Sequence, residues 1–118
     1  MDLITIIISD APYGLERPWN ALRLALTLTS AAIKSKVNVF LLGDAVVIAK
    51  KGQRLPEGYY NLEKMLTDLI RQGENVRACS TCLKARGLNQ DDLVEGVEIG
   101  AMIELAKWVT ESRSVLSF

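Results

Sequence analysis

Residues Leu3–Ser9 read LITIIIS, a short and almost continuous apolar run in which β-branched side chains dominate. Such a run is typical of a strand that is buried on both faces, because a strand with one wet face would alternate apolar and polar residues. We therefore expect this strand to lie centrally in a covered sheet. Two further strands are expected over Val37–Leu42, which Gly43 and Asp44 close, and over the shorter Asn75–Cys79.

The segments between these runs have the spacing of helices. One helix is expected over Pro18–Lys34, because a proline suits the first helical turn. A second is marked by the apolar face Leu62, Met65, Leu66, Leu69 and Ile70, and Gly73 stands where it would end. Shorter features follow the same logic: helical turns over Ala45–Ala49 and Leu83–Arg86, and an exposed loop over Lys50–Gly58.

The last third of the chain predicts one more helix and one more strand. Asn89, with Asp92 three residues on, is typical of a helix start. A helical apolar stripe then continues through Ile99, Met102, Ile103, Ala106 and Val109, and Val115–Phe118 is expected to be a short strand. Alternating strands and helices predict a three-layer α/β/α sandwich with a mostly parallel sheet of about four to five strands, in one domain over residues 1–118.

Composition limits the possible functions. The chain has 118 residues, of which 49% are hydrophobic, and 14 Lys plus Arg balance 14 Asp plus Glu. A net charge of zero offers no general attraction to nucleic acid or to an anionic membrane. No apolar run approaches the roughly 18 to 20 residues of a membrane span, and the first residues lack the basic region of a signal peptide. We expect a soluble cytoplasmic protein that binds neither membrane nor nucleic acid directly.

The first predicted helix carries two apolar stripes. Trp19, Leu22, Leu26 and Ile33 form one, and Leu24, Leu28 and Ala31 form the other. A small monomer has little need for the second stripe, which therefore indicates a subunit interface. Trp19 and Trp108 are expected to be core or interface anchors.

The tetrapeptide Cys79-Ser80-Thr81-Cys82 is the main chemical motif of a chain that contains no histidine. Cys79 ends a predicted strand and precedes a helical turn, where amide donors and the helix dipole lower the pKa of a thiol. Cys79 is therefore the candidate nucleophile. The spacing alone leaves four alternatives: packed structural cysteines, half of a zinc site completed by carboxylates or by another subunit, a dithiol that cycles with a disulfide, and a persulfide carrier.

Other polar residues are expected near this motif. In a parallel sheet the loops after successive strands converge at the carboxyl edge, so Asp10, Tyr13, Gly14 and Asp44 are candidates to line a pocket with Cys79. Ser80, Thr81, Lys84 and Arg86 belong to the motif and its turn, and the two cations are candidates to offset a sulfur anion. The alternative is ordinary turn chemistry for the loop residues and solvation for Lys84 and Arg86.

The motif lies in Ala78–Leu88, ACSTCLKARGL, and this segment resembles the DsrE/DsrF-like sulfur-relay family. The resemblance extends to almost the whole chain. It includes Ala11–Gly14, Ala21–Ala25, the LLGDAV stretch Leu41–Val46, Gly52-Gln53 and the ending Val115–Phe118, in the order of the family.

The resemblance implies an α/β/α domain that assembles into homo-oligomers, as trimers or hexamers. It implies a sulfurtransferase-type carrier that takes sulfur as a persulfide on Cys79 from a protein donor and gives it to a protein acceptor, with no cofactor and no metal. Cys82 has no counterpart among the sulfur-carrying subunits, which leaves it as a resolving, protective or structural thiol. The alternative function is an oligomeric ligand-binding or scaffold protein whose cysteines pack or form a disulfide.

Overall fold

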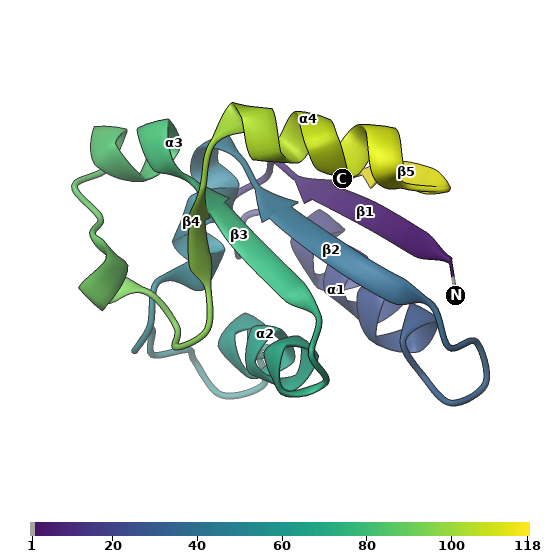
Figure 1. Cartoon of the computed structure of the whole chain (residues 1–118). Coiled ribbons are helices and arrows are strands. Elements are labelled where there is room, and N and C mark those ends of the chain that lie inside the picture. The colour runs from purple at the N-terminus through teal and green to yellow at the C-terminus, as the bar shows by residue number, and fades with distance from the viewer. Residues whose placement is uncertain (1) are drawn as a thin grey trace.

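The computed structural model describes residues 2–118 and has an α/β/α sandwich architecture. Five strands in this range form one sheet in the order β4-β3-β2-β1-β5, with every neighbouring pair parallel. The strands are β1 (Leu3–Ile8), β2 (Lys36–Leu41), β3 (Asn75–Cys79), β4 (Glu98–Gly100) and β5 (Ser114–Ser117). Figure 1 shows α1 (Arg17–Leu28) and α2 (Leu62–Arg71) on one face and α4 (Met102–Glu111) on the other. The predicted fold class is confirmed.

The apolar runs occupy the interior of the sheet, as their composition predicts. β2 lies between β1 and β3, and β1 lies between β2 and β5. All residues of β2 after Lys36 are buried, because helices cover both faces of the sheet at this strand. The one polar residue among them, Asn38, accepts a hydrogen bond from the Asn75 amide at 3.0 Å. No helix in the described range is long and apolar enough to cross a membrane.

The second predicted helix and the short turns also match the structure. Helix α2 begins at an Asn61 side chain that accepts a hydrogen bond from the Lys64 amide, and Gly73 follows the helix with a φ of 86°. The short elements are the 3₁₀ helix η1 (Gly43–Ala49), helix α3 (Ser80–Ala85) and the 3₁₀ turn η2 (Gln90–Asp92). η1 and α3 directly follow β2 and β3, so both begin at the carboxyl edge of the sheet.

The first helix is shorter than predicted. It ends at Leu28 instead of Lys34, and Ile33 is 54% exposed instead of lying on the core stripe. Hydroxyl side chains account for this end, because Thr29 and Ser30 donate to the Leu26 and Thr27 carbonyls and compete with the continuing helix. Of the second predicted stripe, Leu24 and Leu28 are half-buried and Ala31 lies beyond the helix.

The predicted apolar stripe of the last helix is wrong. Ile99 belongs to edge strand β4, and the Asn89 start leads only to the three-residue turn η2. Helix α4 instead buries Leu105 and Trp108. The predicted stripe residues are exposed, Met102 by 59%, Ile103 by 64% and Val109 by 40%. The helix has two adjacent apolar arcs, and periodicity cannot decide which arc meets the sheet. A three-residue strand is also too short to leave a period-2 signal.

Candidate functional site

Cys79 lies where a strand passes directly into a helix. It is the last residue of β3 and the residue that precedes α3, with φ −60° and ψ 126°. Across the sheet it pairs with Gly100, the last residue of β4. Ligands bind outside the carboxyl ends of parallel strands, because the connecting loops leave free backbone groups there. The local fold therefore puts the thiol at the edge of the sheet that usually carries function.

Hydrogen bonds from the first turn of α3 surround the Cys79 sulfur. Thr81 Oγ1 lies 3.2 Å from Cys79 Sγ. Burial alone would raise the pKa of the Cys79 thiol, but hydrogen bonds from the Thr81 hydroxyl, the Cys82 amide and side chain, and the Thr81 amide lower it. The net pKa lies below the ordinary value of a cysteine. A lower pKa increases the thiolate fraction at neutral pH, which is the nucleophilic form.

Cys82 has a different partner. Its sulfur accepts a hydrogen bond from the Gly43 backbone amide at 3.2 Å, which connects α3 to the start of η1. Gly43 has a φ of +56°, a region that glycine adopts without strain. Sequence reasoning had identified this glycine only as a turn residue. Its position at the end of β2, beside the strand that carries Cys79, was the available signal for a contact with the cysteine motif.

An ion pair between Arg86 and Asp44 is a second connection between the end of α3 and η1. Arg86 Nη2 lies 2.8 Å from Asp44 Oδ1, and Arg86 Nη1 donates to the Cys82 carbonyl at 2.9 Å. The Arg86 guanidinium thus forms an ion pair with Asp44 and also donates a hydrogen bond to a carbonyl near the end of α3. Both residues were predicted near the cysteines, and the structure places them beside Cys82.

The remaining loop candidates bond elsewhere. Asp10 forms an ion pair with Arg17 at 3.0 Å, and the Tyr13 hydroxyl accepts a hydrogen bond from the Leu62 amide at 3.2 Å. Partial burial raises the pKa of Tyr13 above its ordinary value. Its ring lies beside Tyr59 and Tyr60, in a cluster that continues to Trp19. The Tyr13 contacts match the packing role of the alternative interpretation, whereas Asp10 is paired with Arg17.

The other candidates differ in how far they reach the solvent. Gly14, Lys84 and Thr81 are exposed, and Ser80 is half-buried at the first position of α3. Cys79 itself is only 4% exposed, whereas Cys82 is half-buried, and both thiols are free. The Cys79 thiol is therefore much less accessible to a reagent than the Cys82 thiol.

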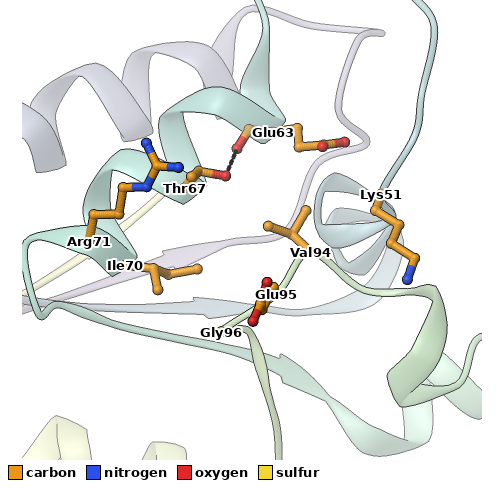
Figure 2. A pocket seen from close by; sticks show the side chains of 8 residues that line it. All are labelled: Lys51, Glu63, Thr67, Ile70, Arg71, Val94, Glu95 and Gly96. Carbon is orange, nitrogen blue, oxygen red and sulfur yellow. Dashed lines mark hydrogen bonds between the residues drawn. The ribbon is translucent and has the colours of Figure 1, made fainter.

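A large cavity lies at a different place. It has a volume of about 510 Å³ and lies between α2 and the segment before β4, lined by Lys51, Glu63, Thr67, Ile70, Arg71, Val94, Glu95 and Gly96 (Figure 2). None of the predicted site residues lines it. Within residues 2–118, no three His, Cys, Asp or Glu side chains gather as a metal site would require.

Known proteins are similar to this chain over nearly its full length. YchN of Escherichia coli K12 is 41% identical over 118 residues, covering all of both chains. An uncharacterized protein of Methanopyrus kandleri is 46% identical over 118 residues, all of this chain and 95% of that protein.

Solved structures agree with these relatives. The crystal structure of the E. coli YchN protein matches with a TM-score of 0.93 at 41% identity and full coverage of both chains. A protein of unknown function from Methanobacterium thermoautotrophicum matches with a TM-score of 0.82 at 18% identity, also with full coverage of both, and shares the fold. Residues 2–118 match the DsrE/DsrF-like family, which is associated with sulfur relay. The chain therefore belongs to the DsrE/DsrF-like family.

Proposed function

We propose that this protein is a sulfur carrier that holds sulfane sulfur as a persulfide on Cys79. The observation that carries the proposal is the set of hydrogen bonds to the Cys79 sulfur from Thr81 and Cys82, which lowers the pKa of the thiol despite its burial. The same donors would stabilise the anionic outer sulfur of a persulfide or the thiolate left behind when that sulfur departs. Membership of a family associated with sulfur relay supports this chemistry.

The loading step needs no external oxidant. The Cys79 thiolate attacks the outer sulfur of a donor persulfide, a new S–S bond forms at Cys79 Sγ, and the donor cysteine leaves as a thiolate. One zero-valent sulfur atom is transferred from the donor cysteine to Cys79, and no electrons are gained or lost overall. The reverse chemistry on an acceptor thiol completes the relay.

The proposed partners are proteins. A protein donor and a protein acceptor would each bring a cysteine to the carboxyl edge of the sheet, and the chain would act as a homo-oligomer, a trimer or a hexamer, without cofactor or metal. The exposed apolar residues Met102 and Ile103 support an interface, since they begin α4 immediately after the strand pair of Cys79 and Gly100.

Intact-mass analysis tests the proposal. The reduced protein is incubated with a persulfide donor and desalted. Its intact mass is then measured before and after treatment with a reductant. We expect wild type to gain the mass of one sulfur atom and to lose it on reduction. Cys79→Ser should show no gain, and Cys82→Ser should still gain one sulfur.

The variants need a folding control, because Cys79 is buried. Circular dichroism and the unfolding midpoint of Cys79→Ser should match wild type closely. Loading that persists in a folded Cys79→Ser protein would remove Cys79 from the mechanism. Folded wild type and folded Cys82→Ser that both gain no sulfur from any of several donors would refute the carrier function.

One observation favours a second candidate function, an oligomeric ligand-binding or scaffold protein. Cys79 is 4% exposed and Cys82 is held by the Gly43 amide, which is also how two packed structural cysteines would look. Thiol titration of the native protein separates the two functions. One fast-reacting thiol supports sulfur transfer, whereas two thiols that react only on unfolding support the scaffold.

A further inference from the structure

The two cysteines lie in the relative position of a reactive pair. Cys79 precedes α3 and Cys82 is its third residue. Side chains three positions apart on a helix are neighbours, with about 5 to 6 Å between Cβ atoms. A disulfide needs a Cβ separation of about 3.5 to 4.5 Å. Cys79 is the N-cap of α3, and an N-cap side chain turns back toward the third residue of its helix, which here is Cys82.

Separate contacts fix the position of Cys82. Its sulfur accepts the Gly43 amide at 3.2 Å, and its carbonyl accepts Arg86 at 2.9 Å, while Arg86 is itself paired with Asp44. The Cys82 side chain is thus held on the side of η1, next to the N-cap position of α3 that Cys79 occupies. The Cys82 sulfur is also half-buried, so it is more open to solvent than the Cys79 thiol, which is 4% exposed.

We propose that Cys82 is a resolving thiol that removes the outer sulfur of the Cys79 persulfide as hydrosulfide. This inference rests on the proposed carrier function of Cys79. The Cys82 proton passes to the outer sulfur, and the Cys82 thiolate attacks Cys79 Sγ. A bond forms between the two cysteine sulfurs, the bond from Cys79 Sγ to the outer sulfur breaks, and hydrosulfide leaves with the electron pair.

The step balances within the protein. The two cysteine sulfurs together lose two electrons, and the sulfane sulfur gains two. The products are one hydrosulfide and a Cys79–Cys82 disulfide, and a dithiol reductant returns the pair to its starting state. A loaded chain that meets an acceptor would pass its sulfur on, whereas a loaded chain without one would release sulfide and become oxidised.

A discharge experiment tests this role. Wild type, Cys82→Ser and the control Ala85→Ser, which changes an exposed residue of the same helix, are loaded with inorganic polysulfide and desalted. Released sulfide and intact mass are then followed without reductant. Wild type and Ala85→Ser should release about one sulfide per loaded chain and end with an internal disulfide. Cys82→Ser should retain its persulfide, with release slowed at least about tenfold, because it lacks the neighbouring thiol.

The outcomes separate the two proposals. Equal discharge rates in loaded wild type and loaded Cys82→Ser would overturn the resolving role and leave the carrier intact. Discharge that gives only disulfide-linked dimers would also overturn it, because the attacking thiol would then come from another chain. Failure of every variant to load would overturn both proposals. Cys82→Ala, with a circular dichroism check, guards against a folding defect specific to serine.

Discussion

The Cys79 sulfur is subject to two opposing influences, burial and hydrogen bonding. Burial disfavours the thiolate, and the donors of Thr81 and Cys82 favour it more strongly. The Thr81 hydroxyl is the first of these donors and belongs to an exposed residue, so it can be changed without disturbing the core. Thr81 is therefore the residue through which the reactivity of the thiol can be adjusted.

Replacing the Thr81 hydroxyl tests this balance. Thr81→Val keeps the shape of the side chain and loses the donor, so the pKa of Cys79 should rise. A hydrogen bond of about 1 kcal/mol corresponds to about a fivefold lower thiolate fraction below the pKa. The rate of alkylation by iodoacetamide at neutral pH should fall by that factor. Thr81→Ser keeps the hydroxyl and should stay near wild type, and an unchanged rate in Thr81→Val would contradict the assigned hydrogen bond.

The lowered pKa also predicts how stability changes with pH. A thiol whose folded-state pKa lies below its unfolded value stabilises the protein above the unfolded value, and this contribution disappears as pH falls through the folded value. The free energy of unfolding of wild type relative to Cys79→Ser should therefore rise from neutral pH toward about pH 9, since free cysteine titrates near about 8.5. Urea unfolding at several pH values measures it. A difference that stays constant or falls with pH would contradict the prediction.

At the residue scale, the sequence was most informative about side chains and least informative about backbone donors. Cys79, Asp44 and Arg86 could be placed at one edge because the strands that precede them are parallel. The Gly43 amide could not be assigned to Cys82, since every residue except proline carries the same donor and only the fold decides which one faces a sulfur. Asp10 and Tyr13 share the edge but bond to closer partners.

Among the structural elements, α2 and the segment before β4 come very close at one point, Gly96, at the edge of the cavity between them. Gly96 has a φ of +95°, and a Cβ there would lie 2.5 Å from Ile70 Cγ2. Ile70 is β-branched, so this methyl group cannot move away by a simple rotation. The glycine is required both for its backbone conformation and for the space that it leaves.

Gly58 gives a matched control for this junction. It has a similar φ of +91°, but a Cβ there meets nothing within 4 Å. Gly58→Ala should cost about 1 to 2 kcal/mol of backbone strain. Gly96→Ala should cost about 1 to 3 kcal/mol more, from overpacking. Denaturant unfolding measures both, and equal losses would show that Ile70 yields without cost.

Strands were easier to predict than helix ends. Continuous apolar runs indicate the interior strands β1 and β2 directly, whereas β3 also carries the exposed Asn75 and the half-buried Arg77. The end of α1 depended on hydroxyl groups that compete for helix carbonyls, and the exposed arc of α4 depended on which side met the sheet. The first depends on local side-chain hydrogen bonds and the second on a contact between elements, and a periodic apolar pattern contains neither.

For the whole molecule, α4 presents an exposed apolar surface. Met102, Ile103 and Val109 are each at least 40% exposed. The proposed homo-oligomer would cover such a surface, because water contact with large apolar groups is unfavourable.

A charge on this surface tests the proposed assembly. Ile103→Asp lies in the first turn of α4, where a carboxylate suits the helix dipole, so the fold should be retained. We expect sedimentation velocity to show a shift from oligomer toward smaller species, with at least about a tenfold weaker association. Lys64→Asp puts a carboxylate at an exposed position in the first turn of α2, on the other face of the sheet, and we expect it to sediment like wild type. An Ile103→Asp protein that sediments like wild type would place the interface elsewhere.

The two tryptophans lie in different layers of the sandwich. Trp19, on α1, stacks on Tyr60 at 4.7 Å and receives Arg23 on its ring, whereas Trp108, on α4, meets Phe40 edge-on at 5.9 Å and receives Arg77. Each indole is thus an intrinsic fluorophore for one side of the sheet. With one tryptophan replaced by phenylalanine at a time, the emission of the other would report when its own layer loosens. Tryptophan fluorescence of these two variants would therefore show whether the helical layers on the two sides of the sheet unfold together or in succession.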